Sequence, residues 1–263
     1  MLRKLLKYDT KNVFKALVVF YILSLFFGLL TRIFLSIDNS FAMNLIGQIC
    51  SGVTISMMIN IVINNLMRLW VRFTYNLYGD ESYLTHTLPV AKKDLYLSKF
   101  LAACITLLVS TAVIGLTLFI AYYSKENILV LKNILIPVSE MFDVNIVGLL
   151  FVVLFILFLE FLAAVQVGYT GIILGHKSNN HKNSLSVLYG FITYMVVQTF
   201  VLVVIAVAGI FNKDIMNLFV TTDIINFKII ITICYLSIFT YITALIAEYF
   251  VNLKLLNKGV NVD

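Results

Sequence analysis

One carboxyl group lies in the middle of a long apolar stretch, Glu160 within residues 146–174. A charge at the centre of a bilayer costs at least about 2.5 kcal/mol, so we expect Glu160 to be protonated, paired or turned towards a wet cavity. Three amide side chains in other apolar stretches could join it as polar points along a path for a substrate, namely Gln198, Asn60 and Asn64. The alternative is a neutral acid that is hydrogen-bonded between helices.

Nucleotide and metal chemistry lack their usual patterns. The segment "GIILGHKS", residues 171–178, has three residues between its glycines and a histidine before its lysine. A phosphate-binding loop needs four residues between the glycines, lysine directly after the second, and a preceding strand. None of the histidines, which are His86, His176 and His181, has a partner at metalloprotease spacing. We therefore expect no catalytic residues, no metal site and no nucleotide hydrolysis by this chain.

Several other residues are better explained by packing or anchoring. The cysteines are odd in number and widely spaced in apolar stretches, which favours packing over disulfides or metal binding: Cys50, Cys104 and Cys234. Small residues fall near one helical face, which lets helices approach closely in lipid: Ala164, Gly168, Gly171 and Gly175. Glu248, near the end of an apolar stretch, is expected to extend to the lipid headgroups.

The most polar segment is "GDESYLTHTLPVAKKD", residues 79–94, in a chain that is 61% hydrophobic. Its first part can form a short helix that is capped by Asp80 and presents Tyr83 and Leu84 to a groove. Pro89 would stop this helix. A second helix, with Lys92 and Lys93 near its start, would then continue into the next apolar stretch.

These polar segments are held between stretches that are long enough to cross a membrane. Only 12% of the residues are charged and the mean hydropathy is +1.00, whereas soluble domains average about 25% charged residues. A bilayer core of about 30 Å needs roughly 20 apolar residues in a helix. Six stretches qualify: 16–34, 45–67, 100–122, 146–174, 187–210 and 229–251. We predict an all-α polytopic protein, with residues 1–263 forming a single transmembrane domain.

Lysine and arginine predict the orientation, because they gather on the cytoplasmic side. Fourteen lie on the side of the termini: Arg3, Lys4, Lys7, Lys11, Lys15, Arg68, Arg72, Lys92, Lys93, Lys99, Lys177, Lys182, Lys254 and Lys258. Five lie opposite: Arg32, Lys125, Lys132, Lys213 and Lys228. Both termini and the loop 68–99 are therefore predicted to be cytoplasmic. The net charge of +6 reflects topology and attraction to anionic lipid, and does not indicate nucleic-acid binding.

The segments flanking the first and third spans are amphipathic or apolar. Residues 1–15 place leucines on one helical face beside basic residues, as an interfacial elbow helix would, with Asp9 or Thr10 as the N-cap of the first span. The alternative is a basic flank that only orients that span. The outer loop 123–145 is apolar enough to lie on the outer leaflet, and Pro137 is expected to break it.

The loop sequence "YGDESYLTHTLPVAKKDLYLSKF", residues 78–100, carries a family resemblance. The order Gly79, Glu81, Leu84, then Leu-Pro-Val at 88–90 and Ser-Lys at 98–99 resembles the cytoplasmic loop of ABC transporter permeases of the type-2 (ABCG-like) exporter class, particularly short bacterial ones. The elbow helix, the six spans and the position of the loop are similar to such permeases over the whole chain. Ala91 departs from the pattern, where a serine is expected, and puts the local capping in doubt.

The resemblance implies that the loop is a coupling helix that docks onto a separate ATP-binding subunit. That subunit would bind ATP and magnesium, while this chain would be neither an enzyme nor a cofactor protein. Six spans would form half a transporter in the bacterial cell membrane, completed by a second copy or a homologous permease. The coupling residues would be Gly79, with the positive φ of a turn, and Asp80, Glu81, Tyr83, Leu84, Leu88, Pro89 and Lys92.

Two functions follow from these patterns. The first is the permease subunit of an ATP-driven exporter for an amphipathic or apolar substrate, such as an antimicrobial peptide, a lipid or a drug. The second is a stand-alone membrane immunity or sensor-accessory protein without an ATPase. In that case the loop 79–94 would be a solvated segment whose charges only hold the topology.

The charge asymmetry generates a prediction about accessibility. Single cysteines placed next to Lys92 and Lys258 should react with a membrane-impermeant thiol reagent only after the cells are permeabilised. A cysteine next to Asp214 should react in intact cells. Labelling near Lys92 from outside would reverse the orientation and contradict a docking role for the loop.

Overall fold

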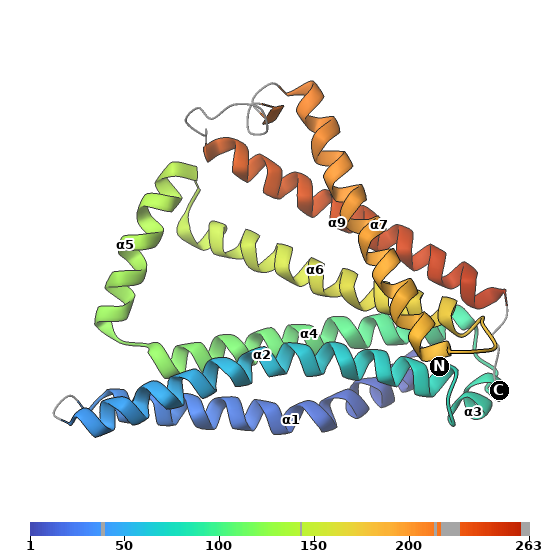
Figure 1. Cartoon of the computed structure of the whole chain (residues 1–263), viewed down its shortest axis with the longest axis horizontal. Helices are drawn as coiled ribbons and strands as arrows, with labels where there is room; N and C mark the ends of the chain where they lie inside the picture. Colours follow the sequence, from blue (N-terminus) through green and yellow to red (C-terminus); the bar gives the residue numbers. More distant parts are fainter. Residues whose placement is uncertain (38–39, 143, 213–214, 217–226, 259–263) are drawn as a thin grey trace. The chain divides into compact units, whose positions relative to one another are not determined.

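The computed structural model describes residues 1–37, 40–142, 144–212, 215–216 and 227–258. Its helices are α1 (Leu2–Leu35), α2 (Phe41–Leu77), α3 (Ser82–Thr87), α4 (Lys92–Tyr122), α5 (Lys125–Phe142), α6 (Ile146–Gly175), α7 (Lys182–Phe211) and α9 (Phe227–Asn257), as drawn in Figure 1. No strand occurs in the described ranges. Asp214, next to which a cysteine is predicted to be labelled in intact cells, lies outside the described residues.

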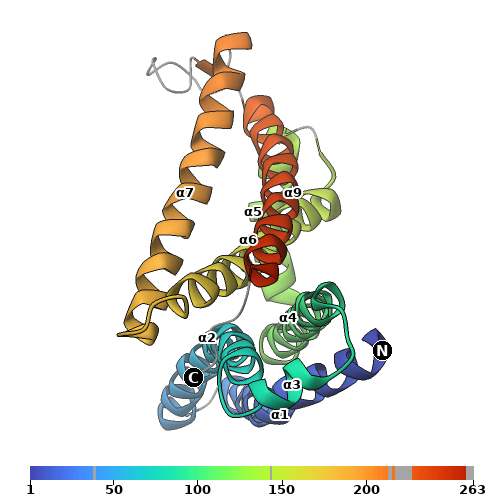
Figure 2. The same ribbon diagram turned by 90° about the vertical axis from the view of Figure 1, so that its right-hand side faces the viewer.

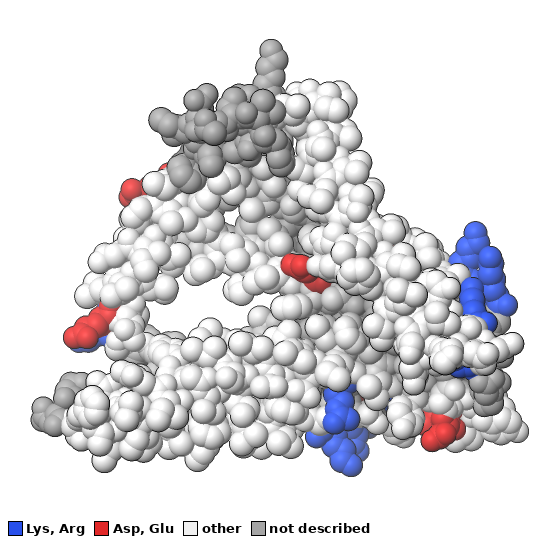
Figure 3. Space-filling view, viewed as in Figure 1, with Lys and Arg blue, Asp and Glu red and all other residues white. Residues whose placement is uncertain are grey.

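The six predicted spans are confirmed as helices. Within the described part of the chain, α1, α2, α4, α6, α7 and most of α9 are long and apolar enough to cross a membrane. Figure 3 shows a face on which most of the surface belongs to uncharged residues. The chain is thus a multi-pass integral membrane protein. Each of these helices is longer than the apolar stretch predicted for it, because helical structure continues into the residues that flank the stretch.

The first correction concerns the start of α1, which runs without interruption from Leu2 to Leu35 with Met1 at its N-cap. Asp9 and Thr10 therefore lie within the helix, and neither is the N-cap that the sequence predicted. Asp9 lies on the same buried face as Val13 and Leu17, at helical spacing of four residues. An interfacial elbow within residues 1–15 stays a prediction.

A second correction concerns α5, which continues through Pro137. The predicted break at this residue is wrong. A proline removes one helical hydrogen bond, but it can kink a helix without ending it, and α5 continues to Phe142. None of the described side chains of α5 is buried.

The chain divides into two compact units, Met1–Val130 and Leu131–Asp263. In the first, α1 packs against both α2 and α4, and α3 packs against α2 (Figure 2). Hydroxyl pairs join these helices inside the bundle: Tyr21 with Ser110 at 2.8 Å, Ser24 with Thr117 at 3.1 Å and Thr31 with Thr54 at 3.0 Å. Such bonds average about 0.6 kcal/mol each in a membrane protein. The bundle is therefore specified by polar pairs as well as by apolar packing.

In the second unit, α6 packs against α7 and α9. Gln166 donates to the carbonyl of Leu245 at 3.0 Å, and Thr170 donates to Asn252 Oδ1 at 2.8 Å. These bonds join α6 to α9 at two levels of the interface, and they satisfy polar groups that have no access to water.

Gly171 and Gly175 bring α6 and α7 into backbone contact. A Cβ added at Gly171 would lie 2.5 Å from the carbonyl oxygen of Ser186 and 2.6 Å from the amide nitrogen of Gly190. A Cβ at Gly175 would also overlap Ser186. The predicted close approach is confirmed for these two glycines.

This packing makes Gly171 intolerant of the smallest side chain. Gly171→Ala should lower the free energy of unfolding by about 1–3 kcal/mol, because the added methyl group meets backbone atoms that cannot rotate away. Gly115→Ala is the matched control, since a Cβ there meets nothing within 4 Å and alanine favours the helix. Thermal unfolding in detergent measures both. Equal midpoints for the two variants would contradict the close approach.

Candidate functional site

The polar loop forms a short helix, α3, that is followed by a break at Pro89 and by α4 from Lys92. The order of helix, proline and second helix is as predicted. The cap is different, because Glu81 rather than Asp80 occupies the N-cap position of α3. The Glu81 carboxylate does not cap the helix, since it accepts hydrogen bonds from Arg72 and Asn76 instead. Ala91 is the N-cap of α4 and has no side-chain cap bond.

The two sides of α3 differ sharply. Ser82 and Thr85 are buried, whereas Tyr83 is 76% and Leu84 is 67% exposed. Leu88, just beyond the helix, is also exposed. Two exposed apolar residues thus lie on a helix of only six residues, and a third follows it directly. We call Tyr83, Leu84 and Leu88 the α3 surface.

Polar contacts hold the buried side of α3 against the end of α2. Asn76 Nδ2 donates to Thr85 Oγ1 at 3.1 Å, and Thr85 Oγ1 donates to the carbonyl of Glu81 at 3.0 Å. A ring nitrogen of His86 lies 3.1 Å from the carbonyl oxygen of Leu77. These contacts supplement the backbone hydrogen bonds of α3, which alone would not stabilise so short a helix in water.

Gly79 links α2 to this helix, but not through the conformation that the sequence predicted. Its φ lies outside the left-handed region, so a positive φ is not what this turn requires. A Cβ at Gly79 would lie 3.1 Å from Tyr75 Cα and 3.2 Å from the Tyr75 carbonyl oxygen. Space explains the glycine. Next to it, burial raises the pKa of Tyr78, which keeps the phenol neutral.

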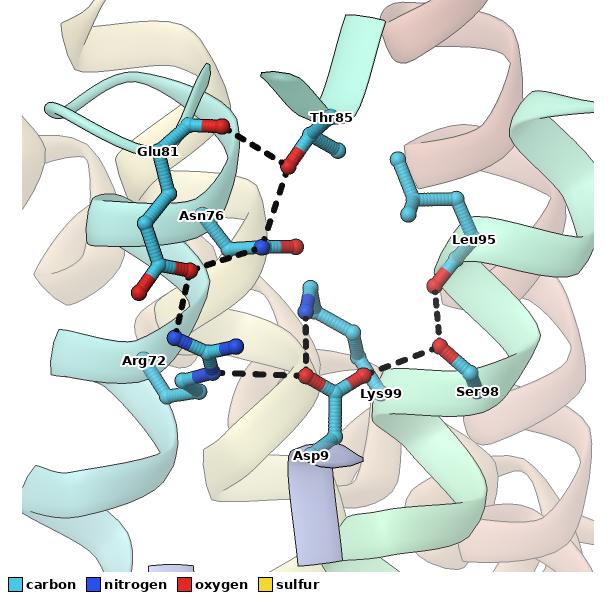
Figure 4. A network of polar contacts seen from close by, with 8 residues as sticks. All are labelled: Asp9, Arg72, Asn76, Glu81, Thr85, Leu95, Ser98 and Lys99. Atoms are coloured by element: carbon cyan, nitrogen blue, oxygen red, sulfur yellow. Dashed lines mark hydrogen bonds and ion pairs between the residues drawn. The ribbon is translucent and has the colours of Figure 1, made fainter. Parts of the chain in front are cut away.

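A network of four charged residues lies beside α3, at the end of the three-helix bundle (Figure 4). Asp9 of α1 accepts from Lys99 Nζ at 2.9 Å, from Ser98 Oγ at 3.0 Å and from Arg72 Nε at 3.4 Å. Arg72 Nη1 also donates to Glu81 Oε2 at 2.6 Å. Asp9 is 5% and Lys99 3% exposed. Two acids and two bases balance one another. Asp9 belongs to α1, Arg72 to α2 and Lys99 to α4, and Glu81 is the N-cap of α3.

Sequence reasoning missed this network because it treated its members separately. Arg72 and Lys99 were counted as topology charges, and Asp9 was assigned to a cap. The available signal was the position of Asp9 four residues before Val13 and eight before Leu17, on the apolar face of α1. An acid on such a face is buried and needs a basic partner.

The residues predicted for a polar path fall into two groups. Gln198 of α7 shares a side-chain hydrogen bond with Tyr241 of α9, whereas Glu160 lies on α6 and is half-buried. Asn60 and Asn64 belong to α2 in the first unit and donate to carbonyls one turn earlier in their own helix. The four predicted residues are thus divided between the two units, two in each.

The position of Glu248 contradicts the prediction that it reaches the headgroups. It is 8% exposed in α9, and neither carboxyl oxygen has a hydrogen-bond partner among the described residues. It is flanked on α9 by Leu245 and Asn252, which both contact α6. Packing of α9 against α6 explains why its side chain cannot extend to the surface.

Among the described residues, no group of three or more histidine, cysteine, aspartate or glutamate side chains could hold a metal ion. No family model, curated protein or solved structure matches the chain. The resemblance to exporter permeases thus rests on the chain's own sequence, above all on the loop 78–100.

The buried network generates a prediction about stability. Lys99→Met keeps the length and volume of the side chain but removes the closest cation of Asp9. Because an uncompensated charge is then left in the bundle, the free energy of unfolding should fall by about 3–5 kcal/mol. Lys93→Met is the matched control, since Lys93 is exposed and lies six residues before Lys99 on the same helix. Thermal unfolding in detergent measures both variants, and an unchanged midpoint for Lys99→Met would contradict a stabilising contact between Lys99 and Asp9.

Proposed function

We propose that this chain is the membrane-spanning permease subunit of an ATP-driven ABC exporter. The observation that carries the proposal is the α3 surface. Tyr83 and Leu84 are exposed on a helix whose other side is fixed by polar contacts, and Leu88 is exposed just beyond that helix. Exposed aromatic and aliphatic side chains on a fixed helix are the anchors expected for a helix that docks in a groove of another protein. The resemblance of the loop to coupling helices names the class of partner, an ABC ATP-binding subunit.

The arrangement around α3 supports a role in force transfer. α3 is joined to α2 by Asn76 and Thr85, and α4 begins only five residues after α3 ends. A displacement of α3 by the partner would therefore act on two membrane helices at once. A solvated topology loop would not need such fixation, because charges alone suffice for orientation.

The complete transporter would contain two permeases, either two copies of this chain or one copy with a homologous permease, together with two ATPase subunits. ATP and magnesium would bind to the ATPase subunits. Surrounding lipid is the remaining partner, and the bacterial cell membrane is the location. The predicted orientation places both termini and α3 in the cytoplasm, on the side where ATP is available.

The proposed substrate class rests on the composition of the spans. Few charged residues occur in the predicted spans, and Glu160, Gln198 and Tyr241 are polar residues among them in the second unit. Such a composition suits an amphipathic or apolar substrate, such as an antimicrobial peptide, a lipid or a drug. Among these, the resemblance to exporter permeases favours a peptide.

Removing the anchors of the α3 surface should separate the ATPase from the permease. Truncation at an interface hot spot costs roughly 2 kcal/mol or more, so Tyr83→Ala combined with Leu84→Ala should weaken association at least ~30-fold. The measurement is co-purification of the tagged chain from its own membranes, with the ABC ATPase subunit identified by mass spectrometry and its affinity then determined with purified subunits.

Phe41→Ala serves as the control, because Phe41 is also exposed but is the first residue of α2, at the other end of that helix from α3. It should retain the ATPase. If the wild-type chain binds no ABC ATPase, or if the double variant retains both the ATPase and full export, the coupling role is wrong. A stand-alone immunity or sensor-accessory protein would then be the better explanation.

A further inference from the structure

Asp9 is the point at which the network beside α3 meets the first helix. Its carboxylate accepts from Ser98 and Lys99 of α4 and from Arg72 of α2, while Asp9 itself belongs to α1. Three helices that are distant in sequence thus meet at one buried side chain. Figure 4 shows Asp9 between α4 on one side and Arg72 on the other.

Arg72 continues this connection to α3. Its guanidinium lies between the two carboxylates, with Nε 3.4 Å from Asp9 Oδ1 and Nη1 2.6 Å from Glu81 Oε2. A guanidinium presents its donors in a rigid fork, so holding one edge fixes the direction of the other. Asp9 therefore sets the orientation in which Arg72 meets Glu81 at the N-cap of α3.

Packing alone does not account for these charges. Asp9 and Lys99 are nearly fully buried, and a buried ion pair is often no more stabilising than apolar residues of similar volume. The hydroxyl pairs and apolar side chains of α1, α2 and α4 already specify the bundle. What the charged residues add is a side-chain connection from α3 to α1 that does not follow the backbone.

We propose that Asp9 is a positioning residue that couples α3 to α1 and α4 through Arg72. A shift of α3 changes the contact of Glu81 with Arg72, and the rigid guanidinium passes this change to Asp9 and its partners on α4. The N-terminal part of α1 is thereby included in the response to docking on α3. The transmission of ATPase docking to α1 rests on the proposed function. The side-chain connection from α3 to α1 does not, because it is formed within this chain.

The first test uses the purified full-length chain without any ATPase. Asp9→Asn keeps the shape of the side chain and removes its charge. Hydrogen exchange of the α3 amides should become about tenfold faster in Asp9→Asn, because Arg72 loses its fixed edge and holds Glu81 less firmly. Asp94→Asn is the control, since Asp94 is an acid in the first turn of α4 outside the network. It should leave exchange in α3 unchanged.

A double-mutant cycle separates coupling from a general loss of stability. Asp9 and Glu81 both contact Arg72, so the effects of Asp9→Asn and Glu81→Gln on α3 exchange should be strongly non-additive. Asp9→Asn and Tyr83→Ala should be additive, because Tyr83 lies on the exposed side of α3. Additive effects in the first pair, or unchanged exchange in a folded Asp9→Asn variant, would overturn the proposal.

If Asp9→Asn does not fold, Arg72→Lys decides the question. Lysine keeps the charge but lacks the fork that meets both carboxylates, so α3 exchange should again increase about tenfold. Unchanged exchange in folded Arg72→Lys would overturn the proposal.

The ATPase enters only in the last measurement. Asp9→Asn should bind the ATPase subunit within about threefold of the wild-type affinity, since the α3 surface is intact, while substrate-stimulated ATP hydrolysis should fall about tenfold. Full stimulation would overturn the transmission role. If the wild-type chain binds no ATPase, the proposed function fails, whereas the exchange measurements still decide whether Asp9 positions α3.

Discussion

The constraint on which the structure depends is the absence of water inside the bilayer. Every backbone amide and carbonyl must find its partner within the chain, so the spans are continuous helices and their side chains decide how they assemble. The helices α1 and α2, with 34 and 37 residues, also extend well beyond the roughly 20 residues that a bilayer requires. Outside the spans, Pro89 separates the short helix α3 from α4.

With backbone groups satisfied, the polar side chains become the means of specifying which helices pair. In the first unit, pairs of hydroxyl groups join α1 to α2 and α4. In the second unit, Gln166 and Thr170 join α6 to α9, and two glycines bring α6 onto α7. Lipid offers no hydrophobic preference between helices, so close packing and hydrogen bonds take over that role. The two units use the same physics with different residues.

The sequence was most informative where one local rule decides the outcome. All six spans were predictable from length and hydropathy, and so was the break between α3 and α4, since Pro89 cannot continue a helix. The details that failed depend on partners far along the chain. Asp9 was assigned to a cap because its partner Lys99 lies 90 residues away, and Glu81 replaced Asp80 at the N-cap of α3 while its carboxylate bound Arg72.

Rules based on residue type alone also predicted the wrong backbone conformation at Gly79 and Pro137. A glycine after a helix suggests a positive φ, but here the close approach of the Tyr75 backbone leaves little room for a Cβ. A proline suggests a break, but α5 continues through it. At each position the residue type allows several local structures, and the tertiary surroundings decide which of them forms.

The position of the buried charges connects these observations. Charged side chains are most costly at the bilayer centre and least costly near its edge, and the network of Asp9, Arg72, Glu81 and Lys99 lies where α1, α2 and α4 meet α3. The four charged side chains join three helices and the N-cap of α3 by contacts that do not follow the backbone. A guanidinium suits this position because its rigid fork can meet two carboxylates at once, whereas apolar contacts are non-directional. All four residues lie outside the stretches predicted to cross the bilayer, so they avoid the free-energy cost of a charge at the bilayer centre.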